Sequence, residues 1–168
     1  RGPLFLADTT INRNPTAEQI AEITFNVART LKKFKVTPKI ALLSYSNFGS
    51  APGEDAEKMA QAVKILHEKH PTLIVDGEVQ ANFAMNNELM NEKFSFSLLA
   101  NKDVNTLIFP NLSAGNIAYK LLQEITERDA IGPILVGLKK SVHVLQMGSS
   151  VREIVNMVKV AVVDAQTK

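Results

Sequence analysis

Short, uninterrupted apolar runs alternate along this chain with stretches whose apolar residues recur at helical spacing. The runs that we predict to be strands are residues 4–7, 39–45, 73–75 and 107–109, with further candidates at 134–137 and 142–146. The stretches that we predict to be helices are residues 16–35, 54–69, 83–92, 114–127 and 150–165. Strands without a polar side are typical of parallel sheets that are covered on both faces. The alternation therefore predicts a three-layer α/β/α fold with a mainly parallel sheet of about five strands.

Two of the predicted helices begin with a recognisable capping box. Thr16 is followed three residues later by Gln19, and Ser150 is followed by Glu153 at the same spacing. In such a pair the hydroxyl accepts a free backbone N–H of the first turn, and the longer side chain reaches back to the cap. We therefore expect helices to begin at these two points.

The composition excludes several classes of function. The 168 residues suit one domain, and 19 Lys and Arg against 17 Asp and Glu leave a net charge of +2, which argues against nucleic acid as a partner. There is no cysteine, which rules out disulfides, thiolate nucleophiles and Cys-based metal sites. No apolar run reaches the length of about 18 residues that a membrane span needs. Because the chain opens at Arg1 without a Met, we expect it to be a fragment of a longer protein.

Small and polar residues gather where the predicted strands end. The five clusters are residues 8–10, 44–50, 76–78, 111–116 and 148–150. Ligands of open parallel sheets bind beyond the carboxyl ends of the strands, and helix starts there can hold anions through backbone N–H groups. The clusters therefore suit a phosphate-rich ligand such as a nucleotide or coenzyme. The alternative is that they serve only as turns and helix caps.

The histidines do not suggest a metal site. His67 and His70 lie three residues apart at the end of a predicted helix, and no third ligand accompanies them. His143 lies between Val142 and Val144 in a predicted strand, which favours a structural role. We predict no bound metal in this chain.

Four segments carry a family resemblance. They are IALLSYSNFGS at 40–50, IVDGEVQAN at 74–82, TLIFPNLSAGNIAYKLLQ at 106–123 and IGPILVGLKKSVHVL at 131–145. In this order they resemble the second half of the phosphate acetyl/butyryltransferase family, which has an isocitrate/isopropylmalate dehydrogenase-like fold. The resemblance implies transfer of an acyl group between an acyl phosphate and coenzyme A.

The chain departs from that family where the chemistry is expected. Family members typically have Asn-Asp-Leu-Ser-Arg-Gly-Cys-Ser after the last of these segments, followed by a catalytic Asp. Here Gln146 stands at the position of the Ser, Met147 at that of the Arg and Glu153 at that of the Asp. A thioether cannot replace a charged, forked donor, and one lost oxyanion donor costs on the order of 3 kcal/mol in other enzymes. We therefore expect that efficient acyl transfer is lost and that no catalytic residue remains.

The sequence His-Val-Leu-Gln-x-Gly at 143–148 resembles a narrower group, the C-terminal phosphotransacetylase-like domain of large bacterial malic enzymes. This resemblance implies a cytoplasmic, noncatalytic domain that binds acetyl-CoA as an allosteric effector and forms homo-oligomers. The same polypeptide would carry a malate dehydrogenase part, where NADP and a divalent metal are expected. The predicted acetyl-CoA contacts are Ser46, Gly115, Asn116, Gly137, Gln146, Met147, Gly148 and Ser149.

Two other functions are compatible with the same residues. One is an active phosphate acetyltransferase or butyryltransferase with an altered site, and the other is an assembly domain with an empty cleft. The resemblance also implies that residues 1–168 lack the family's first subdomain. The terminal helix at 150–168 would belong to that subdomain, and so would pack loosely here or against a neighbouring copy.

Overall fold

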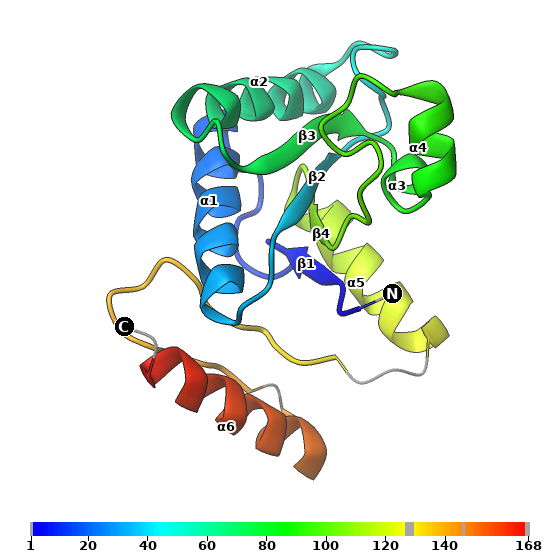
Figure 1. Cartoon of the computed structure of the whole chain (residues 1–168). Helices are drawn as coiled ribbons and strands as arrows, with labels where there is room; N and C mark the ends of the chain where they lie inside the picture. Colours follow the sequence, from blue (N-terminus) through cyan, green and yellow to red (C-terminus); the bar gives the residue numbers. More distant parts are fainter. Residues whose placement is uncertain (1, 127–129, 146, 167–168) are drawn as a thin grey trace.

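A four-stranded, all-parallel sheet organises the chain (Figure 1). The computed structural model describes residues 2–126, 130–145 and 147–166. In chain order the strands are β1 (Phe5–Ala7), β2 (Lys39–Leu43), β3 (Ile74–Val79) and β4 (Thr106–Ile108). They lie side by side in the order β1-β4-β2-β3. The helices are α1 (Ala17–Lys33), α2 (Glu54–Lys69), α3 (Ala81–Ala84), α4 (Asn87–Lys93), α5 (Leu112–Thr126) and α6 (Val151–Gln166).

Each face of the sheet has its own apolar core. Along β2, Ile40 and Leu42 pack into one cluster with side chains of α1 and α2, whereas Ala41 and Leu43 pack into the other. That second cluster includes Met90 of α4 and residues of α5. Successive side chains of a strand point to opposite faces, so an entirely apolar strand must be covered on both. The predicted three-layer α/β/α fold is confirmed.

Both predicted capping boxes form. At α1, the Gln19 amide donates to Thr16 Oγ1 over 3.3 Å, and the Thr16 amide donates to Gln19 Oε1 over 2.9 Å. At α6, the Glu153 amide donates to Ser150 Oγ over 3.2 Å, and the Ser150 amide donates to Glu153 Oε2 over 2.6 Å. The predicted helix at 54–69 coincides with α2.

Four of the predicted elements differ clearly from the structure. The strand expected at 73–75 continues to Val79, and the helix expected at 83–92 is divided into α3 and α4. The expected strands at 134–137 and 142–146 are wrong in the part of the chain that the structure describes, where Ile134 and His143 form only an isolated antiparallel bridge. Val142, Val144 and Leu145 are more than two-fifths exposed there, so no core covers them. The sheet therefore has four strands rather than about five.

The last two long helices bury little of their apolar surface. Gly115 is the buried residue of α5, and Met157 is that of α6. The exposed apolar side chains are Ile117, Leu121, Leu122 and Ile125 on α5, and Val151, Ile154, Val155, Val158, Val162 and Val163 on α6. Figure 1 shows α6 apart from the sheet, below the end of α1. In the residues that the structure describes, none of the helices has the length and apolarity to cross a membrane.

Candidate functional site

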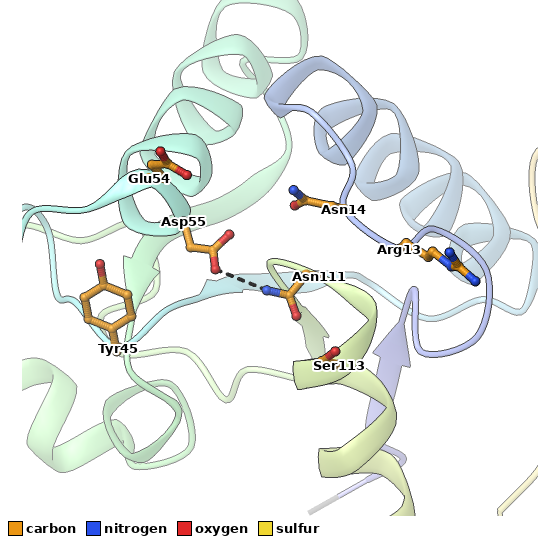
Figure 2. Close-up of a pocket in the computed structure, with 7 residues that line it drawn as sticks. All are labelled: Arg13, Asn14, Tyr45, Glu54, Asp55, Asn111 and Ser113. Carbon is orange, nitrogen blue, oxygen red and sulfur yellow. Dashed lines mark hydrogen bonds between the residues drawn. The ribbon is translucent and has the colours of Figure 1, made fainter.

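The carboxyl ends of the strands surround a hollow of about 610 Å³. Its walls come from the loops after β1, β2 and β4 and from the starts of α2 and α5. The lining residues are Arg13, Asn14, Tyr45, Glu54, Asp55, Asn111 and Ser113 (Figure 2). This is the edge of the sheet at which the sequence predicts a ligand, and at which parallel α/β proteins bind theirs.

Asp55 joins the walls of this hollow. Its Oδ2 accepts a hydrogen bond from Asn111 Nδ2 over 3.1 Å, and its Oδ1 accepts one from Lys58 Nζ over 2.7 Å. Lys58 Nζ also donates to Asn14 Oδ1 over 2.7 Å. The loops after β1 and β4 are thereby tied to the first turn of α2.

The charges around the hollow nearly balance. Glu54 and Asp55 contribute two carboxylates, while Lys58 is paired with Asp55 at 2.7 Å. Arg13 is exposed, and Figure 2 shows its guanidinium pointing away from Asp55. The hollow can therefore hydrogen-bond a polar ligand, and Arg13 is the cation that it offers to an anionic group within the described residues.

The loop after β2 is held from inside by a buried carboxylate. Glu78 Oε1 accepts hydrogen bonds from Ser46 Oγ and from the Gly49 amide, both over 2.7 Å. Ser46 is fully buried, and its Oγ also accepts the Ala51 amide over 3.1 Å. The predicted acetyl-CoA contact Ser46 therefore lies within the loop rather than on its surface, beside Tyr45 of the hollow.

Gly115 and Asn116 lie in the first turns of α5, close to the hollow. Asn116 Nδ2 donates to the Thr9 carbonyl over 3.0 Å. A Cβ at Gly115 would lie 3.1 Å from the Asp8 carbonyl oxygen, so the absence of a side chain lets α5 approach the end of β1. Both residues hold the helix against the carboxyl edge, two and three positions beyond Ser113.

The remaining predicted contacts lie elsewhere. Gly137 lies beside α1, where an added Cβ would come within 3.1 Å of Asn26 Nδ2. Met147, Gly148 and Ser149 lie immediately before α6, and the Met147 side chain is fully exposed. Gln146 lies outside the described residues. The expectation that all five polar clusters share one edge is thus wrong for 148–150, because in the part of the chain that the structure describes no strand of the sheet ends directly before them.

Glu153 caps the start of α6. Its carboxylate caps the Ser150 amide, as described above. Burial raises the pKa of the Tyr119 hydroxyl on α5, and the charge of Glu153 raises it further. The described residues hold no group of three or more His, Asp or Glu side chains that could bind a metal ion.

Sequence reasoning missed Arg13, Asn14 and Asp55. Asp55 stands in the first turn of a helix, where acidic residues are common for electrostatic reasons alone. The cluster at 111–116 did contain Asn111 and Ser113, which the structure brings to the hollow. What the sequence does not indicate is the bond from Asn111 to Asp55, which spans 56 positions.

Comparison with known proteins places this arrangement in a family. Residues 1–162 match the model of the phosphate acetyl/butaryl transferase family. The chain is 46% identical to an NADP-dependent malic enzyme of Haemophilus influenzae over 98% of its own length and 22% of that protein's. It is 42% identical to a phosphate acetyltransferase of Clostridium acetobutylicum, of which it covers 50%.

A solved structure agrees with these sequence matches. The phosphotransacetylase of Streptococcus pyogenes superimposes with a TM-score of 0.89 and 41% identity, over 96% of this chain and 49% of that one. The chain thus spans about a fifth of this malic enzyme and about half of each of the two transferases named here. It belongs to the phosphate acetyl/butaryl transferase family.

Proposed function

We propose that this chain is a noncatalytic regulatory domain of a malic enzyme and that it binds acetyl-CoA as an allosteric effector. The observation that carries the proposal is Met147. By the family resemblance it stands where the transferases have an arginine, and its fully exposed side chain offers neither charge nor a hydrogen-bond donor. The similarity to NADP-dependent malic enzymes supports the same context.

Glu153 adds a second argument against acyl transfer. A general base must reach the proton that it removes. The carboxylate of Glu153 instead accepts the Ser150 amide over 2.6 Å, in the capping box of α6. Helix capping alone therefore accounts for a glutamate at position 153, and no catalytic role is needed to explain it.

Acetyl-CoA would bind between the carboxyl edge and a region outside this chain. Arg13 is the exposed cation at the hollow and would contact phosphate groups of the coenzyme. The start of α6, with Gly148 and Ser149, would supply backbone N–H groups. Effector binding would then shift the dehydrogenase between its states according to the difference in affinity of those states for acetyl-CoA.

Isothermal titration calorimetry on the full-length polypeptide tests the binding step. We expect heat on adding acetyl-CoA, and a stabilisation of about 2.7 kcal/mol at a hundredfold excess over the dissociation constant. Arg13→Ala should weaken binding about tenfold, because charge-assisted bonds to phosphate are lost. Arg29→Ala removes an exposed arginine of α1 instead and should bind like wild type. Absence of both heat and stabilisation in wild type would favour a purely structural assembly domain.

An acyl-transfer assay distinguishes the noncatalytic domain from the main alternative, an active phosphate acetyltransferase or butyryltransferase. With acetyl phosphate and CoA we expect no turnover above the uncatalysed rate. The combined variant Gln146→Ser, Met147→Arg, Glu153→Asp would restore the transferase pattern, so any gain in rate would identify these positions as the cause. Robust turnover by wild type would overturn the noncatalytic assignment.

We propose that a malate dehydrogenase part adjoins this domain, with NADP and a divalent metal bound there, in a cytoplasmic homo-oligomer. We also propose that the helix at 150–168 belongs to the first subdomain of the family. Support for this comes from the exposed apolar side chains of α6, which need a partner to cover them.

A further inference from the structure

Tyr45 presents an aromatic ring at the wall of the hollow. The residue is 54% exposed and lines the hollow, whereas its neighbour Ser46 is fully buried. Single exposed apolar side chains are common on protein surfaces and need no explanation by themselves. Tyr45 differs from these because both its backbone and the tip of its ring are held in place.

Three contacts with β3 and the residue after it fix the backbone around Tyr45. The Ser44 amide donates to the Val79 carbonyl over 3.0 Å, and the Tyr45 carbonyl accepts a hydrogen bond from Gln80 Nε2 over 2.6 Å. The hydroxyl of the next residue donates to the buried carboxylate of Glu78 over 2.7 Å. The chain is therefore anchored before, at and after Tyr45. A ligand that contacts this ring does not have to order a loop, and loop ordering is one of the main costs of binding.

The ring itself is held against the start of α2. Tyr45 Oη donates a hydrogen bond to the Pro52 carbonyl over 3.3 Å. A Cβ at Gly53 would overlap Tyr45 Oη, so the absence of a side chain at Gly53 leaves the space that the tip of the ring occupies. Since the tip is fixed while more than half of the residue is exposed, the ring offers a rigid, flat surface to the hollow.

The charges of the hollow decide which end of a ligand can reach this ring. Figure 2 shows Tyr45 and Glu54 on one side of the hollow and Arg13 on the opposite side. The Glu54 carboxylate repels phosphate groups and the Arg13 guanidinium attracts them, while Asp55 is paired with Lys58. A ligand with phosphates therefore turns its anionic part toward Arg13 and an uncharged planar part toward Tyr45. The exposed Glu54 carboxylate can accept a hydrogen bond from an amino group on that planar part.

We propose that Tyr45 stacks on the base of a bound nucleotide and that, in acetyl-CoA, it stacks on the adenine. The choice of acetyl-CoA as the ligand rests on the proposed function. An aromatic side chain accepts any base on its face, and removing such a ring costs at least about fivefold in affinity. Tyr45 thus gives affinity for the nucleotide end of the coenzyme and leaves the acetyl group to other residues.

Isothermal titration calorimetry of the full-length polypeptide tests the stacking with two probes. One is acetyl-CoA, and the other is adenosine 3′,5′-bisphosphate, which carries the base and phosphates but neither pantetheine nor an acetyl group. We expect Tyr45→Ala to weaken the binding of both probes by the same factor, at least about fivefold. Weaker binding of acetyl-CoA alone overturns the proposal, and so does wild type that does not bind the bisphosphate at millimolar concentration.

Two further substitutions at Tyr45 separate stacking from other roles of the ring. Tyr45→Phe keeps the flat face and loses only the hydrogen bond to Pro52, so its affinity should lie much closer to wild type than to Tyr45→Ala. Tyr45→Leu keeps an apolar side chain without an aromatic face and should lose as much affinity as Tyr45→Ala. Wild-type affinity in Tyr45→Leu contradicts stacking.

Phe96→Ala is the matched control. It removes an aromatic residue that is 69% exposed, in the turn after α4, and that lies outside the lining of the hollow. We expect this variant to bind both probes like wild type. A loss equal to that of Tyr45→Ala would mean that the effect does not arise at the hollow, and would contradict the proposal.

The two probes also keep this inference distinct from the proposed function. If wild type binds the bisphosphate through Tyr45 but gives no heat with acetyl-CoA, the base-binding role is supported and the effector role is removed. If acetyl-CoA binds wild type and Tyr45→Ala equally, the effector role is supported and the stacking is overturned. Absence of heat with either probe overturns both.

Discussion

At the scale of single residues, two buried carboxylates of β3 hold two different loops. Glu78 accepts Ser46 Oγ and the Gly49 amide in the loop after β2. Asp76 accepts Ser97 Oγ and the Leu98 amide, both over 2.8 Å, in the turn that follows α4. A buried carboxylate is tolerated only when donors surround it. Through these bonds the two carboxylates hold both loops in place.

Glu78→Gln tests this role. The amide retains one acceptor oxygen but loses the charge that strengthens both bonds. We expect the free energy of unfolding to fall by about 2 kcal/mol, measured by urea denaturation. Glu124→Gln, on an exposed part of α5, should change it by less than about 0.5 kcal/mol. An equal effect of the two substitutions would contradict the role of Glu78.

At the scale of helices, the same capping box has different consequences at α1 and α6. The Thr16 box begins a helix that buries six residues, including Ile20 and Leu31. The Ser150 box begins a helix that buries only Met157 among its described residues. Because most helical stability in proteins comes from packing of an apolar face, α1 forms with the whole domain while α6 can open alone.

Thr16→Ala and Ser150→Ala distinguish these two situations. Each removes one side-chain acceptor for the helix start, worth about 1 kcal/mol. We expect Thr16→Ala to lower the free energy of global unfolding by that amount in urea denaturation. Ser150→Ala should leave global unfolding unchanged and should raise amide exchange within α6 only. If Ser150→Ala destabilises the whole domain as much as Thr16→Ala, α6 is an integral part of the core.

Local signals predicted most of these elements from the sequence. The capping boxes and the helical periodicity belong to residues three or four positions apart, so the bounds of α2 and the start of α1 were predictable. The strands expected near 134–137 and 142–146 were not formed, because an apolar run becomes a strand only beside a partner strand and under a core. The hollow at the carboxyl edge depends on long-range hydrogen bonds such as the one that Asn111 donates to Asp55. No local sequence pattern predicts such a bond.

At the scale of the whole molecule, the apolar surface is unevenly covered. The cores on the two faces of the sheet are closed, whereas Ile117, Leu121 and Ile125 form a stripe on α5, each more than half exposed. They are four residues apart and so lie on one face of the helix. A stripe of this kind is typical of an interface, which supports the proposed homo-oligomer.

Leu121→Glu tests whether α5 forms that interface. A carboxylate in the centre of the stripe would have to be desolvated on association, so the dissociation constant of the oligomer should rise at least about tenfold, equivalent to about 1.4 kcal/mol. Sedimentation equilibrium of the full-length polypeptide over a range of concentrations measures this shift. Gln61→Glu adds the same charge to an exposed position of α2 and should associate like wild type. Wild type that remains monomeric at every concentration contradicts the oligomer, and an unchanged constant in Leu121→Glu places the interface on another surface.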